Sequence, residues 1–163
     1  MTTITIRTAT PADASALARL RFRFRSEMGN PSEPADAFAE RCARWMADRL
    51  GGDPHWRCWV AEEPDGILGN LWLQLIEKVP NPVAEPEHHA YVTNVYVLPE
   101  RRNTGTGELL LAAALDWCRG GTIVDAVLLW PSARSRPFYA RHGFAARDDL
   151  FALRPVLPPT GGA

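Results

Sequence analysis

Alternating and helical patterns of apolar residues predict the elements at the start of the chain. Thr3–Arg7 alternates isoleucine with polar residues, which is typical of a short strand. Thr10 is a favourable N-cap and Pro11 suits the first helical position, so a helix should begin there and extend to about Met28. The arginine-rich stretch 19–25 alternates with period two, as a strand does. Its apolar stripe and the strong start signal nevertheless favour a helix.

The remaining patterns predict three more helices and several strands. The helices are expected over Pro34–Leu50, Gly107–Gly120 and Pro137–His142. The strands are expected over Trp56–Glu62, Ile67–Val79, Ala90–Leu98 and Ile123–Trp130, with one or two more within Phe144–Leu153. The first two of these strands enclose a hairpin turn, whereas the strand–helix–strand order of the second half requires locally parallel strands. We therefore expect an α/β fold with one mixed sheet and helices on both faces.

Composition and charge exclude several classes of protein. The 163 residues suit one domain over 1–163, with an irregular tail from about residue 155. The formal net charge of -1 excludes an overall basic surface for nucleic acid. No apolar run approaches the roughly 18 residues of a membrane span. The cysteines and histidines lack metal-ligand spacing, so we expect no metal, and the three separated cysteines fit a reducing cytoplasm.

A glycine-containing turn between an apolar strand and a helix carries the strongest chemical signal. It comprises Arg102, Asn103, Thr104, Gly105, Thr106 and Gly107. Glycine lets the backbone approach a ligand closely, and successive N–H groups at a helix N-terminus form a site for phosphate. Arg102 can add a charge-assisted contact. The same residues would also suit a glycine-rich connection between a strand and a helix that binds nothing. A dinucleotide-binding turn fits poorly, because Leu110 stands where the G-x-G-x-x-G motif has its third glycine.

Three motifs follow one another in a recognisable order. Val95–Pro99 ends a strand with the pattern V-x-V-x-P, residues 102–107 read R-x-x-G-x-G, and Tyr139–Phe144 reads Y-x-x-x-G-F. This set resembles the signature of the GNAT superfamily, the acyl-CoA-dependent N-acyltransferases. The N-terminal strand and capped helix also resemble the family's opening, so the resemblance covers nearly the whole chain. It implies a GNAT-like central mixed sheet with a splayed, V-shaped cofactor slot.

The resemblance also implies a binding site for acetyl-CoA as cosubstrate. A bulge near Asn94 would splay the strand, and the pantetheine arm would pair like an extra strand with the backbone of Val95, Tyr96 and Val97. The turn at 102–107 would hold the pyrophosphate, and Ser135 joins the cofactor-binding residues. The family often has glycine and a basic residue where this chain has Asn103 and Thr104. Asparagine tolerates a left-handed backbone, whereas the threonine removes a charge for the phosphate.

The catalytic residues implied by the resemblance are Tyr139 and Asn94. Tyr139 would protonate the leaving CoA thiolate as general acid, and Asn94 lies in the bulge. Some relatives carry a glutamate on the central strand as general base, but no carboxylate stands near the corresponding Tyr91. The base is left open between a water chain and the side chains of Glu27, Glu87, His88 or His89.

These observations predict an N-acetyltransferase that moves an acetyl group from acetyl-CoA to a primary amine by direct attack in a ternary complex. The alternative is a non-catalytic acyl-CoA sensor or interaction module of the same fold. The expected partner is a small-molecule amine or a peptide, with neither nucleic acid nor membrane involved. We further expect a cytoplasmic location and include a homodimer among the expectations. The sequence does not identify the acceptor, because fold does not fix it.

Overall fold

The computed structural model describes residues 3–121, 123–153 and 155. The chain divides into two compact units, Met1–Leu129 and Trp130–Ala163. The strands and long helices of the described residues all belong to the first unit, and the second contains one short helix, α4 (Arg136–Arg141).

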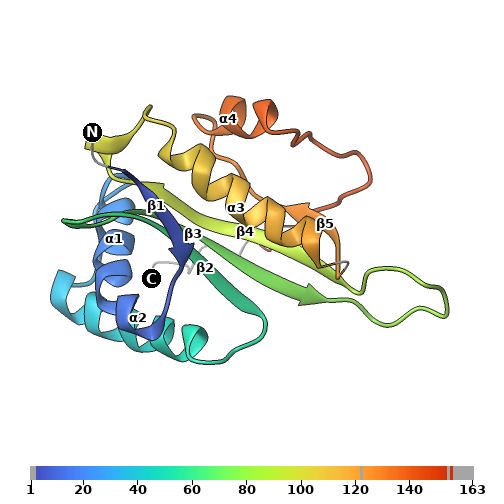
Figure 1. Ribbon diagram of the computed structural model, residues 1–163, viewed down its shortest axis with the longest axis horizontal. Helices are drawn as coiled ribbons and strands as arrows, with labels where there is room; N and C mark the ends of the chain where they lie inside the picture. The colour runs from blue at the N-terminus through green and yellow to red at the C-terminus, as the bar shows by residue number, and fades with distance from the viewer. Residues whose placement is uncertain (1–2, 122, 154, 156–163) are drawn as a thin grey trace, which may run out of the picture. The chain divides into compact units, whose positions relative to one another are not determined.

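The first unit is built on a five-stranded sheet. Its strands are β1 (Thr5–Thr8), β2 (Trp56–Glu63), β3 (Gly66–Glu77), β4 (His88–Val97) and β5 (Val124–Leu128). They lie side by side in the order of the sequence (Figure 1). The first three pairs are antiparallel, and β4 with β5 is parallel. The parallel strands β4 and β5 are joined by a crossover connection that contains α3 (Thr106–Gly120).

Helices cover both faces of this sheet (Figure 1). On one face α1 (Ala14–Ser26) and α2 (Ala35–Leu50) bury Leu17 and Met46 against Trp72 of β3. On the other face α3 brings Trp117 to 6.1 Å from Trp59 of β2, measured between ring centroids. The alternation of side chains along each strand separates these two cores.

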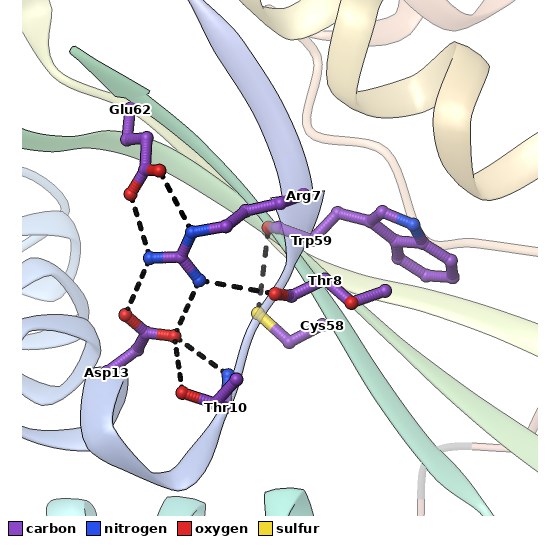
Figure 2. A network of polar contacts seen from close by, with 7 residues as sticks. All are labelled: Arg7, Thr8, Thr10, Asp13, Cys58, Trp59 and Glu62. Atoms are coloured by element: carbon purple, nitrogen blue, oxygen red, sulfur yellow. Dashed lines mark hydrogen bonds and ion pairs between the residues drawn. The ribbon is translucent and has the colours of Figure 1, made fainter.

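The N-terminal strand is fixed to the helix that follows it by an arginine with two carboxylates. Arg7 of β1 donates to Asp13 over 2.8 and 2.9 Å and to Glu62 of β2 over 2.7 and 3.0 Å (Figure 2). The backbone N–H of Thr10 donates to the same Asp13 carboxylate over 2.7 Å. These contacts tie the outer strand of the sheet to the turn Pro11–Asp13 that precedes α1.

The expected α/β fold with a mixed sheet and helices on both faces is confirmed. The alternating stretch 19–25 is helical, as the apolar stripe predicts. The prediction of one or two strands within Phe144–Leu153 is wrong, because these residues form no strand. The segment has no β-branched residue, and Arg147 pairs locally with Asp149.

The domain prediction is not settled by these observations. A single domain over 1–163 stays a prediction, and most of its expected irregular tail lies outside the described residues.

Candidate active site

One edge of β4 is paired with β5 in the first part of the strand and has no strand partner among the described residues in the second part. His88, His89, Ala90 and Tyr91 pair with β5, and the pairing stops there. From Val92 to Val97 the strand continues with β3 on one side and without a strand partner on the other, within the described residues. Unpaired N–H and C=O groups along a strand edge can accept another extended chain.

A bulge lies where β4 parts from β5. Thr93 pairs with Trp72 and Tyr96 with Asn70, so two residues of β4, Asn94 and Val95, oppose a single residue of β3. Asn94 has a φ of 49°, in the left-handed region that asparagine tolerates better than most residues. A bulge of this kind bends the strand and directs its edge away from the neighbouring strand.

Two side chains hold the bulge from different elements. The amide nitrogen of Asn70, which is 1% exposed, donates to the Asn94 carbonyl over 2.7 Å. The Arg21 guanidinium of α1 donates to the Asn94 side-chain oxygen over 3.1 Å. Close approach of the strands also requires Gly69, because a Cβ there would lie 2.7 Å from the Tyr96 carbonyl oxygen. The left-handed backbone of Asn94 is thus fixed by β3 and α1 together.

The turn after β4 exposes a row of backbone N–H groups at the start of α3. Asn103 and Gly105 have φ values of 62° and 85°, and the helix begins at Thr106. The Thr104 hydroxyl donates to the Arg101 carbonyl over 2.7 Å and closes the turn. Among the described residues, no acceptor takes the N–H groups from Asn103 to Gly107. This geometry forms an anion-binding concavity that the helix dipole reinforces.

Arg102 is directed away from this row of N–H groups. Its Nε donates to the Val97 carbonyl over 3.0 Å, and its terminal nitrogen donates to Glu27 over 2.7 Å. The Tyr96 hydroxyl donates to the other Glu27 oxygen over 2.6 Å. Burial, and then the contact with Glu27, raises the pKa of Tyr96 to about 12. The side chain of Arg102 therefore anchors the end of β4 to the end of α1.

The same contacts weaken Glu27 as a candidate base. Desolvation opposes its ionisation, but hydrogen bonds from Tyr96 and Arg102 outweigh it and hold the pKa of Glu27 below its ordinary value. A carboxylate that already accepts two hydrogen bonds and resists protonation is a poor acceptor for a further proton.

The histidine pair occupies a different place from the one expected. His88 and His89 belong to β4 rather than to a loop, and both pair with β5 at the far end of the strand. His89 lies five residues from Asn94, or about 16 Å at the rise of a strand. Neither histidine is therefore within proton-transfer distance of the bulge.

In the second unit, Tyr139 of α4 is buried among aromatic rings. The ring centroids of Phe138 and Phe144 lie 5.1 and 5.7 Å from that of Tyr139. Burial raises the pKa of Tyr139 to about 12, so its hydroxyl keeps its proton at neutral pH. Ser135 precedes the helix, and its hydroxyl contacts that of Ser132 at 2.9 Å.

The described residues contain neither a cluster of metal ligands nor a membrane-spanning helix. No group of three or more histidine, cysteine, aspartate or glutamate residues could hold a metal ion. No helix in the described ranges is long and apolar enough to cross a membrane.

Comparisons with known proteins confirm the family. The profile of the acetyltransferase (GNAT) family matches residues 17–144, so the chain belongs to this family and is an acetyltransferase. A predicted acetyltransferase from Clostridium acetobutylicum, solved with acetyl-CoA, is 23% identical with a TM-score of 0.77, over 93% of this chain and 96% of that chain. A GCN5-related N-acetyltransferase from Ralstonia eutropha JMP134 is 25% identical with a TM-score of 0.73, over 94% and 99%. An aminoglycoside acetyltransferase from an uncultured soil sample, in complex with sisomicin, is 18% identical with a TM-score of 0.70, over 94% and 96%. No curated protein matches the chain significantly.

Sequence reasoning missed three residues that shape this site. Asn70 had a detectable signal, since it is a lone polar residue in the apolar run Ile67–Leu73. Gly69 had a weaker one, because glycine inside a strand often marks a close backbone approach. Arg21 could not be told apart from the other arginines at alternate positions from 19 to 25, a run that fits one solvated helix side and also fits a surface that lines an acidic acceptor or a phosphate-rich partner.

Proposed function

We propose that the protein transfers an acetyl group from acetyl-CoA to a primary amine, by direct attack of the amine on the thioester. The observation that carries this proposal is the succession of an unpaired strand edge, a bulge and an N–H-lined helix start along residues 92–107. An extended, phosphate-ended molecule matches all three features in that order.

The residues fit the parts of acetyl-CoA one by one. The unpaired edge of Val95, Tyr96 and Val97 offers backbone groups to the amides of the pantetheine arm. The free N–H groups from Asn103 to Gly107 offer donors to the pyrophosphate. The Thr104 and Thr106 hydroxyls lie 3.0 Å apart and, with Thr104 donating to the Arg101 carbonyl, hold the turn in shape rather than bind the phosphate. The Arg102 side chain is already engaged by Val97 and Glu27, so its contribution is to hold the slot rather than the phosphate.

Acetyl transfer then proceeds within one ternary complex. The neutral amine forms a C–N bond to the thioester carbon, while the carbonyl oxygen takes the negative charge of the tetrahedral intermediate. Backbone N–H at the bulge, next to the left-handed Asn94, would stabilise that oxyanion. The C–S bond breaks, CoA leaves as thiolate, and the nitrogen loses a proton to give the amide. From the neutral amine the net products are the N-acetylated acceptor and CoA thiol, because the proton lost by nitrogen balances the one gained by the thiolate; one further proton is released when the acceptor arrives as ammonium.

Tyr139 assists departure of the thiolate. Its pKa of about 12 lies above the value near 8.5 of a free thiol, so complete proton transfer to a separated thiolate is uphill. A hydrogen bond to sulfur that strengthens as the C–S bond breaks avoids this cost. We therefore assign Tyr139 as hydrogen-bond donor and proton source for the leaving group, with water able to complete the protonation.

Water is also the best remaining base for the acceptor ammonium. Glu27 is engaged by two donors, and Glu87, which directly precedes His88, lies with the histidine pair at the other end of β4. The acceptor is a small amine or a peptide. The homodimer and the cytoplasmic location expected from the sequence stay predictions.

The lack of a free carboxylate or histidine among the described residues at the bulge favours a second candidate, an acyl-CoA sensor without turnover. Both candidates need the slot, and only the enzyme needs an acceptor. An amine panel with acetyl-CoA, read as release of free thiol, separates them.

The first experiment is a thermal shift with acetyl-CoA. A ligand at about 100 times its dissociation constant stabilises the folded state by about 2.7 kcal/mol, so a clear rise in Tm is expected. NAD and ATP at equal concentration serve as controls and should give a smaller rise. An unchanged Tm at millimolar acetyl-CoA would contradict the proposed site.

A further inference from the structure

Arg21 is a half-buried guanidinium whose charge no described carboxylate balances. Its hydrogen-bond acceptor is the neutral side-chain oxygen of Asn94, and its guanidinium lies 5.6 Å from the Phe24 ring centroid. Three other arginines that join elements have acidic partners, namely Arg7 with Asp13 and Glu62, Arg101 with Glu63, and Arg102 with Glu27, whereas Arg57 packs on the Trp117 ring. A partly desolvated charge without a counter-ion is costly, so it is the natural place for an anion to bind.

The electrostatic surroundings of Arg21 make its unbalanced positive charge more costly still. Burial first, and then the like charge of Arg25 one turn away, lowers the pKa of Arg21 below its ordinary value. Both effects raise the free energy of the bare cation. An anion placed beside Arg21 relieves both of them at once.

The position of Arg21 relates it to the reacting carbon. The pantetheine arm, as proposed above, continues the sheet alongside β4, so the thioester carbonyl lies near the sheet plane at the bulge. A nucleophile attacks a carbonyl carbon from above or below its plane. Arg21 reaches Asn94 from α1, which covers one face of the sheet. An acceptor that approaches from this face therefore passes the guanidinium.

We propose that Arg21 binds an anionic group of the acceptor, a carboxylate or a phosphate, and thereby selects amines that carry such a group close to the reacting nitrogen. This inference rests on the proposed function and specifies its acceptor class. Amino acids, peptides with a nearby acidic group and phosphorylated amino sugars belong to this class. Polyamines and polycationic antibiotics do not, because Arg21 would repel them.

A purely structural role explains Arg21 less well. Asn70 also holds the bulge, through the Asn94 carbonyl, and the contact of Arg21 with the Asn94 side chain needs a donor but no charge, so a neutral glutamine could replace it. Within the described residues the positive charge meets the Phe24 ring but no carboxylate. Charge and hydrogen bonding can be separated by experiment, since Arg21→Lys keeps the first and Arg21→Gln keeps a donor.

The test compares matched acceptors with the full-length protein and acetyl-CoA. One arm compares each standard amino acid with its α-amide, which lacks the carboxylate. Another arm compares glucosamine 6-phosphate with glucosamine, which lacks the phosphate. Spermidine and kanamycin represent cationic amines. We expect kcat/KM for at least one anionic acceptor to exceed that of its uncharged partner by at least about tenfold. The two arms show whether the anion is a carboxylate or a phosphate.

Substitutions on α1 test whether the preference for anionic acceptors depends on Arg21. Arg21→Gln should lower kcat/KM for the anionic acceptor by about 10- to 100-fold, mainly through KM, because a hydrogen bond to a charged group is lost. Its effect on the uncharged partner should be clearly smaller than on the anionic acceptor, because glutamine keeps a donor for Asn94 and Asn70 still holds the bulge. Arg21→Lys should recover part of the loss. Arg19→Gln, which removes an equal charge from an exposed position on the same helix, should have little effect. The acetyl-CoA dissociation constant should be unchanged in all three variants, which excludes a collapsed bulge.

The outcomes separate the two proposals. If acetyl-CoA does not bind, or no amine in the panel is acetylated, the proposed function fails and the inference fails with it. If the enzyme prefers uncharged or cationic amines, the proposed function stands and the role of Arg21 is overturned. The role is also overturned if Arg21→Gln lowers kcat/KM equally for the anionic acceptor and its uncharged partner.

Discussion

Arg7 lies in β1 at one end of the sheet, Arg21 of α1 contacts β4 towards the other end, and the two arginines have opposite surroundings. Arg7 joins β1 to the start of α1 through two carboxylates, with both of them accepting two hydrogen bonds from the guanidinium. Arg21 reaches the bulge of β4 and finds a neutral amide oxygen. The charge of Arg7 is therefore balanced by two carboxylates, whereas that of Arg21 has no carboxylate partner among the described residues.

The strands differ in the same way. At the Arg7 end, β1, β2 and β3 pair without interruption except for one irregularity between Ala61 and Glu62. At the Arg21 end, β4 bulges and parts from β5 after Tyr91. Stability and function are thus separated along the sheet. Substitutions at the first end should change unfolding, and substitutions at the second end should change binding and turnover.

The largest effect is expected at the turn after β4. Gly105→Val should weaken acetyl-CoA binding at least about 100-fold, because a β-branched residue disfavours the φ of 85° and the row of N–H groups must rearrange. Isothermal titration measures this loss. Gly52→Val is a matched control, since Gly52 also has a positive φ and open space around its Cβ position, but lies after α2. Equal affinity of the Gly105 variant and the wild type would show that the turn is only a connector.

A smaller effect, on stability alone, is expected at the Arg7 end. The hydrogen bonds from Arg7 lower the pKa of Asp13 from 3.8 to about 2. Because the folded pKa is depressed, the contribution of about 2 kcal/mol is complete above pH 4 and is lost as the pH falls towards 2. Asp13→Asn should lower the free energy of unfolding by about this amount at pH 7 and by much less near pH 2.

Urea unfolding at several pH values measures the effect of Asp13→Asn. The exposed Asp48 of α2 supplies a control, Asp48→Asn, which should change stability by no more than about 0.5 kcal/mol. Turnover of a working acceptor should be unaffected by both variants at pH 7. A large loss of kcat in the Asp13 variant would break the separation of the two ends.

The smallest effect is expected from Tyr139→Phe. The phenol with its pKa of about 12 is a weak acid, so we expect a loss in kcat of about tenfold, below the roughly 10²–10⁴-fold that a general acid typically contributes. Acetyl-CoA affinity should be kept, because the proposed contacts are made by backbone. Activity should show no fall from deprotonation of this tyrosine below about pH 11. An unchanged kcat would leave thiolate departure to water alone.

Local signals predicted most of the fold. Thr10 and Pro11 marked the start of a helix correctly, because capping depends on neighbouring residues only. The strand β4 begins two residues earlier than predicted, at His88, since pairing with β5 rather than side-chain type decides its start. The segment Phe144–Leu153 failed for the converse reason. A short apolar pattern does not form a strand without a neighbour to pair with.

The site was only partly predictable. The turn at 102–107 and the bulge near Asn94 have family motifs or permissive residues that a reader of the sequence can find. Arg21 and Asn70 depend on how α1 and β3 meet β4, which is a property of the packed sheet. Four arginines at alternate positions look alike in the sequence, and packing alone decides which of them is half-buried.

The unpaired edge of β4 also bears on self-association. An open strand edge can recruit a strand from another copy of the chain, which is the usual route to edge-to-edge aggregation. Here the edge is short, and the bulge at Asn94 and Val95 interrupts the regular spacing that a second strand needs. A bound pantetheine arm would occupy the groups that remain. The feature that opens the sheet to its substrate thus also protects the chain from its own copies.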